Sequence, residues 1–228
     1  KKFDVAMSEY EKYLSLYEVS DAASFAQLKW SLCLNQLRKQ NTAIKEGFQS
    51  VIDYWPESAD AAKASYLIGK TYVAIGRVPS GKKAYQQTIS DYPKNAVAVY
   101  SLAGLAEIAI REKDETSLVK IWKRMAFDIP RTALIQSTCA TAANSLAVYY
   151  FRNGVFASGL ECLETNYKDD RLFHYVYYYS RAPIGDLVAV VETQSVGYKV
   201  ADQTIGFLRK NIETDLSTEQ LTAKALGQ

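Results

Sequence analysis

Apolar residues recur along most of the chain at the three- and four-residue intervals that place side chains on one face of a helix. The clearest apolar stripe closes at Gly76, a residue type that ends helices, and consists of Ala62, Tyr66, Ile68, Gly69, Tyr72 and Ile75. The pattern predicts helices over residues 2–17, 21–38, 42–54, 58–75, 80–91, 95–112, 115–127, 131–152 and 156–166. We therefore expect an all-α chain.

These helices repeat with a period of 37 residues. Pro56, Pro93 and Pro130 are 37 residues apart, and each follows a large aromatic residue by eight positions. A smaller apolar residue or a glycine stands four positions before that aromatic residue. The recurring pairs are Ala6 and Tyr10, Ile44 and Phe48, Gly81 and Tyr85, Leu118 and Trp122, and Gly159 and Leu163. The last step is four residues longer, which is about one helical turn.

Each period has the features of a helix, a turn and a second helix. A small residue lets a neighbouring helix approach closely, and a large side chain one turn later fills the gap between successive units. Proline then stops the second helix because its ring clashes with the preceding turn. The chain is therefore expected to form a solenoid of antiparallel helix pairs.

One stretch also carries a family resemblance. Residues 62–93 resemble the tetratricopeptide repeat family at its signature positions, which are Gly69, Tyr72, Gly76, Tyr85 and Pro93. Gly81 replaces the usual alanine and Ser65 stands where the family favours a bulky aromatic residue, so this repeat is divergent. The Tyr-Pro pair followed by alanine-rich sequence is similar to the subset found in bacterial cell-envelope assembly proteins. The resemblance implies a right-handed α-solenoid, and it favours the periplasm or the cell envelope over the cytoplasm.

The repeats are expected to occupy residues 1–167. Because Ala6 and Tyr10 align with the second helix of later pairs, the array starts in mid-repeat, and we expect the natural polypeptide to extend further toward its N-terminus. Residues 168–228 are expected to form a degenerate repeat and a C-terminal helical cap over the last apolar face. The helices predicted there span residues 170–181, 184–193, 197–212 and 217–226.

Composition narrows the classes of partner. The chain has 228 residues, of which 48% are hydrophobic and 23% charged, an ordinary balance for a globular protein. Its 27 basic and 25 acidic residues give a net charge of +2 without a basic tail, which argues against nucleic acid as a partner. No apolar run approaches the roughly 18 to 20 residues that span a bilayer, so we expect no direct membrane insertion.

The sequence offers few groups for catalysis or metal binding. His174 is the single histidine, which excludes histidine-based metal cages; packing among tyrosines is favoured over a pH-sensitive contact or a catalytic base. Cys33, Cys139 and Cys162 lack the spacing of a metal site and are expected to be buried, inert thiols, with a disulfide between the last two as the alternative. No phosphate-binding loop is present. We expect no enzyme activity, no metal and no cofactor.

Two features near residue 170 have more than one interpretation. Asp169 and Asp170 precede a predicted helix, where capping of the helix N-terminus is favoured over metal coordination. The tyrosines within that helix cannot all face one side, so a packing role and a contact surface both stay open. They are Tyr175, Tyr177, Tyr178 and Tyr179.

In tetratricopeptide arrays the first helix of each pair lines the concave surface, so the resemblance projects a partner-binding face. The projected side chains are Lys29, Gln36, Lys63, Tyr66, Lys70, Tyr100, Glu107, Arg111, Asn144 and Arg152. Five are cationic and one is anionic, an asymmetry that favours a carboxylate or an acidic extended segment as the ligand. The alternative is an ordinary solvated helix face.

These observations favour an adaptor or scaffold that binds a protein or peptide segment on a concave helical surface. One alternative is a substrate-recruiting domain of a larger enzyme or of a transport or assembly complex. Another is a homo-oligomer, in which the first helix and the tyrosine-rich end meet head to tail.

Overall fold

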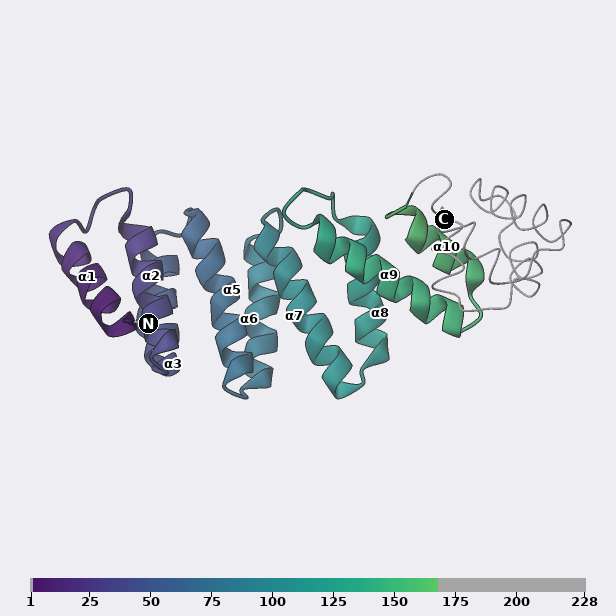
Figure 1. Cartoon of the computed structure of the whole chain (residues 1–228), viewed down its shortest axis with the longest axis horizontal. Helices are drawn as coiled ribbons and strands as arrows, with labels where there is room; N and C mark the ends of the chain where they lie inside the picture. Colours follow the sequence, from purple (N-terminus) through teal and green to yellow (C-terminus); the bar gives the residue numbers. More distant parts are fainter. Residues whose placement is uncertain (1, 168–228) are drawn as a thin grey trace, which may run out of the picture. The chain divides into compact units, whose positions relative to one another are not determined.

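A computed structural model describes residues 2–167, and all regular secondary structure in that range is helical. The predicted all-α fold of adjacent helix pairs is confirmed. Figure 1 shows the helices, which are α1 (Phe3–Leu16), α2 (Ala23–Gln36), α3 (Gln40–Thr42), η1 (Ala43–Phe48), α4 (Gln49–Tyr54), α5 (Ala59–Ala74), α6 (Val78–Asp91), α7 (Ala96–Glu112), α8 (Glu115–Lys123), η2 (Arg124–Asp128), α9 (Gln136–Arg152) and α10 (Phe156–Glu164). The degenerate repeat and cap, His174, the aspartate pair and the tyrosine cluster lie outside the described residues.

The chain divides into two compact units, an N-terminal unit (Lys1–Leu118) and a C-terminal unit (Val119–Gln228), with the boundary inside α8. In the N-terminal unit α1 packs on α2, α2 on η1 and α4, α5 on α6, and α6 on α7. The first helices of successive pairs also contact one another, α2 with α5 and α5 with α7. They therefore form one continuous layer, whose outer side we call the first-helix face. In the C-terminal unit α9 packs on α10 and on η2.

Tyr85 of α6 holds two successive pairs together. Its ring is only 4% exposed and lies between Gly69 of α5 and Gly104 of α7. A Cβ atom at either glycine would come within 2.6 Å of the ring, far inside van der Waals contact. The equivalent Phe48 and Leu163 are fully buried as well. The predicted role of this repeat position, filling the gap between successive pairs, is seen at Tyr85, whereas Tyr10 and Trp122 at the same repeat position are partly exposed.

Each first helix ends at a residue with a positive φ angle. These residues are Arg38 (61°), Gly76 (80°), Lys113 (59°) and Gly154 (71°). The left-handed conformation ends the helix and reverses the chain into the second helix. The second helices η1–α4, α6 and α8–η2 end two residues before a proline, as the repeat predicts.

We expect Gly76→Ala to lower the free energy of unfolding by about 1 kcal/mol, because an alanine Cβ is strained in the left-handed region. No atom lies within 4 Å of the added Cβ, so the loss reflects backbone strain alone. Asparagine tolerates this conformation, so Gly76→Asn is expected to lose less. Urea denaturation of both variants is the measurement, and an equal loss in the two would contradict the strain argument.

The structure departs from the predicted elements in three places. Residues 43–48 and 124–128 form π-helical turns within the second helices, which the sequence pattern did not predict. The helix predicted over 131–152 begins at Gln136 instead of residue 131. Arg131 lies outside the helix, and its guanidinium group is bound to the end of α10, as described below.

Candidate functional site

The residues predicted to bind a partner fall into both compact units. Eight of them lie on α2, α5 and α7 of the N-terminal unit, namely Lys29, Gln36, Lys63, Tyr66, Lys70, Tyr100, Glu107 and Arg111. Asn144 and Arg152 lie on α9 of the C-terminal unit. Side chains spaced by three, four or seven positions share one face of a helix, so the members on α2, on α5 and on α7 each form a stripe along their own helix.

The centre of the N-terminal set is a row of stacked tyrosines. The ring centroids of Tyr66 and Tyr85 are 5.9 Å apart with an interplanar angle of 28°, and those of Tyr66 and Tyr100 are 6.0 Å apart at 54°. Tyr85 is buried, whereas Tyr66 and Tyr100 are partly exposed. We call these three residues the tyrosine row. It shows that α5 and α7 present their stripes on the same side.

The phenol groups of Tyr66 and Tyr85 stay protonated at neutral pH. Burial raises the pKa of Tyr66 above its ordinary value, and the negative charge of Glu107 and the neighbouring Tyr100 raise it further. Burial is also the largest cause of the raised pKa of Tyr85, followed by Tyr66 and Glu107. A protonated phenol can donate a hydrogen bond, so the partly exposed Tyr66 suits an acceptor such as a carboxylate.

The basic residues around the row differ in how they are engaged. Lys63 forms an ion pair with Asp60 at 3.3 Å, and the second oxygen of that carboxylate accepts a hydrogen bond from Ser24 at 3.1 Å. Lys70 and Arg111 are exposed, and the described residues contain no ion pair with either. The positive charge left for a ligand is therefore centred on Lys70 and Arg111.

The α2 end of the stripe has a different character. The ammonium group of Lys29 lies 4.9 Å from the ring centroid of Phe25, whose side chain is 48% exposed. Gln36 is exposed near the end of the helix. Asn35 donates a hydrogen bond to Thr71 at 3.2 Å, which ties α2 to α5. This end therefore offers the apolar ring of Phe25, the amide group of Gln36 and the positive charge of Lys29, which lies over that ring.

In the C-terminal unit the structure engages Asn144 internally. Its amide nitrogen donates to Tyr167 at 2.9 Å, and its oxygen accepts from Asn166 at 2.6 Å. Arg152 is exposed at the last position of α9. Asn144 therefore holds Asn166 and Tyr167 against α9. Of the two predicted binding residues on α9, Arg152 is the exposed one.

The same network contains a residue that the sequence did not single out. Arg131 donates to the backbone oxygen of Thr165 at 2.9 Å and to its hydroxyl at 2.7 Å, and it also bonds the side-chain oxygen of Asn166. Thr165 is the residue that closes α10. A cationic side chain is favourable at this end of a helix, where carbonyl oxygens lack helical partners.

The three cysteines are the remaining side chains that could be reactive, and all three are buried. Cys33, Cys139 and Cys162 are buried and unpaired, as predicted, and the alternative disulfide is not formed. Burial raises the pKa of all three thiols, that of Cys162 to about 12, so they are protonated and unreactive at neutral pH. Within residues 2–167 no cluster of three or more His, Cys, Asp or Glu side chains could hold a metal ion.

None of the helices between residues 2 and 167 is both long enough and apolar enough to cross a bilayer.

Comparison with known protein families adds an independent finding. Residues 63–95 match the family model of the tetratricopeptide repeat. The matched segment covers α5 and α6, the pair that holds Tyr66 and Tyr85. The match supports a relationship to this family, and such repeats generally serve protein–protein interaction and are typically non-catalytic. No curated protein matches the chain significantly.

Proposed function

We propose that the chain is a non-enzymatic scaffold that binds an acidic, extended segment of a protein partner on the first-helix face of its N-terminal unit. The observation that carries the proposal is the contact between the partly exposed Tyr66 and Tyr100, with the exposed Lys70 and Arg111 on the same two helices. Aromatic residues and arginine are the side chains that most often dominate binding at protein interfaces.

The arrangement suits an extended ligand better than a compact one. The continuous layer of α2, α5 and α7 provides a broad surface across successive helices. Tyr66 and Tyr100 offer flat rings in the middle of it, and the cationic groups of Lys70 and Arg111 attract carboxylates. Glu107 is the one acidic residue of the set, and it opposes an acidic ligand at the centre.

Reversing the positive charges tests this proposal. We expect the triple variant Lys63→Glu, Lys70→Glu and Arg111→Glu to weaken binding of acidic peptides by about 100-fold, because each reversal replaces an attraction by a repulsion. Glu107→Gln is expected to strengthen the same binding a few-fold. Anisotropy of fluorescent acidic peptides, selected from a library on the wild-type chain, gives the dissociation constants.

A matched triple variant separates a local site from the effect of net charge. Lys12, Lys45 and Lys83 are exposed on the second helices, and changing them to glutamate alters the net charge by the same amount. This control is expected to change the dissociation constant by less than about 3-fold at moderate salt, where distant charges are screened. Equal losses in both triple variants, or no loss in the first, would remove the first-helix face as the binding site.

A further inference from the structure

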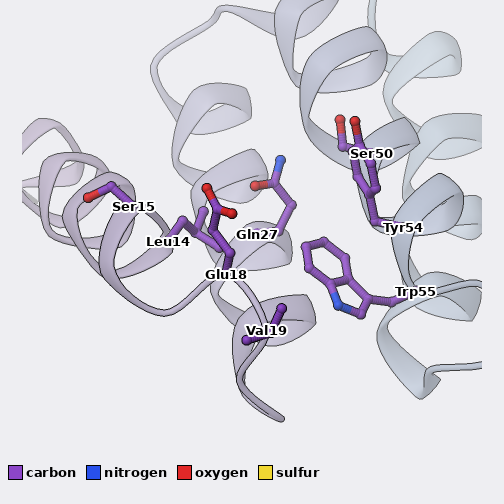
Figure 2. Close-up of a pocket in the computed structure, with 8 residues that line it drawn as sticks. All are labelled: Leu14, Ser15, Glu18, Val19, Gln27, Ser50, Tyr54 and Trp55. Carbon is purple, nitrogen blue, oxygen red and sulfur yellow. The ribbon is translucent and has the colours of Figure 1, made fainter.

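A hollow opens in the N-terminal unit between the end of α1, the loop that follows it and the end of α4 (Figure 2). Its volume is about 790 Å³, within the range of pockets that hold small ligands. Gln27 of α2 lines it and lies about 200° around that helix from Lys29, so the hollow is on the side opposite the first-helix face. No extensive contact joins α1 to α4 within the described residues, which leaves the space open.

An aromatic pair forms one wall of the hollow. The ring centroids of Tyr54 and Trp55 are 5.9 Å apart with an interplanar angle of 63°, an edge-to-face arrangement. Figure 2 shows the Trp55 ring projecting into the hollow, across from Glu18 and Gln27. Trp55 is partly buried and so held in place, whereas Tyr54 is 75% exposed. The indole face is the strongest binding surface for cations among the aromatic side chains.

The polar groups on the walls present mainly hydrogen-bond acceptors. The hydroxyls of Ser15 and Ser50 each donate to a carbonyl of their own helix at 2.8 Å, which uses their single donor. The amide nitrogen of Gln27 donates to a backbone carbonyl at 3.1 Å, and its oxygen stays an acceptor. Glu18 contributes a carboxylate, which only accepts. The walls therefore match a ligand that carries several donors.

Within the two segments that hold the lining every charged residue is acidic, while Lys12, Lys29 and Lys45 border these segments. Residues 13–28 and 46–62 contain every side chain of the lining and no lysine or arginine. Their charged residues are Glu18, Asp21, Glu46, Asp53, Glu57 and Asp60. A surface with one sign of charge raises the local concentration of ligands of the opposite sign.

We propose that this hollow binds an arginine side chain presented by a basic segment of a protein partner. A planar guanidinium group stacks on the Trp55 indole, while its N–H groups donate to Glu18 and Gln27. The volume also accommodates neighbouring residues of the segment, whose apolar parts pack on Leu14 and on Val19, a side chain that is 99% exposed. Because ligand charge and location differ from those of the first-helix face, this site and the acidic-peptide site are tested separately.

The test uses the whole 228-residue chain and a short peptide with one central arginine. The same peptide with citrulline in that position is the neutral isostere. We expect the arginine peptide to shift the indole N–H signal of Trp55 in nuclear magnetic resonance spectra and the citrulline peptide to leave it in place. By anisotropy, Glu18→Gln is expected to weaken binding about 5-fold and Trp55→Leu about 10-fold or more.

A matched variant distinguishes the lining carboxylate from the general charge of the surface. Glu57→Gln removes the same charge from a residue outside the lining, and it is expected to change binding by less than about 2-fold. Equal weakening by Glu57→Gln and Glu18→Gln, or equal binding of the citrulline peptide, overturns the proposal. If acetyl-arginine amide binds as tightly as the arginine peptide, the hollow binds a free small cation, and the proposal of a protein partner is overturned. Circular dichroism verifies that each variant is folded.

Discussion

Replacing Tyr85 with alanine is expected to lower the free energy of unfolding by about 3–5 kcal/mol. The ring is 4% exposed and contacts α5 at Gly69 and α7 at Gly104, so its removal leaves a void between two helix pairs. Neither glycine has a side chain that could fill the space. Equilibrium urea denaturation followed by circular dichroism measures the loss.

Two tyrosine variants serve as controls for this prediction. Tyr85→Phe retains the ring and is expected to cost less than about 1 kcal/mol. Tyr54→Ala removes a ring that is 75% exposed and is expected to change stability by less than about 0.5 kcal/mol. If Tyr85→Ala were no more destabilising than Tyr54→Ala, Tyr85 would not join the two pairs.

The second large effect is expected from Arg131→Ala, which should destabilise the C-terminal unit by about 2–4 kcal/mol. The guanidinium group makes two hydrogen bonds to Thr165 and a third to Asn166, and bonds from charged donors are the stronger ones. Its removal leaves the end of α10 without these donors. Hydrogen exchange of the α10 amides should therefore speed up more than exchange in α5.

Arg131→Lys tests the role of the guanidinium geometry. Lysine retains the charge but cannot form the paired bonds to Thr165, so an intermediate loss is expected. Arg124→Ala is the control, because Arg124 is an exposed arginine at the start of η2, shortly before Arg131 in the sequence. Equal exchange rates in Arg131→Ala and Arg124→Ala would show that Arg131 does not stabilise α10.

The repeat and its packing positions could be predicted because they depend on local periodicity. The 37-residue period identified Phe48, Tyr85 and Leu163 as positions between helices, and all three are buried. The turns after the first helices were placed correctly for a related reason. A positive φ angle favours glycine, which marks two of these turns at Gly76 and Gly154, whereas Arg38 and Lys113 take the same conformation at the other two without a glycine.

The features that were not predicted depend on contacts between distant segments. Arg131 was placed inside a predicted helix, but it precedes α9, and its guanidinium group bonds Thr165, 34 residues further along the chain. The π-helical turn at residues 43–48 differs from an α-helix by a small change of spacing that apolar periodicity does not resolve.

The hollow is lined by residues of α1, α2 and α4 together, so it could not be predicted from the pattern of any single segment. One signal was present: Tyr54 and Trp55 are consecutive aromatic residues before Pro56, where the next repeat has Tyr92 alone before Pro93.

The contact of Tyr85 with both Gly69 and Gly104 has a consequence for how the N-terminal unit unfolds. One side chain contributes to the stability of its own helix pair and to the interface with the next. In repeat proteins such nearest-neighbour terms make adjacent repeats unfold cooperatively. Loss of this ring is therefore expected to weaken both the α5–α6 pair and its packing against α7.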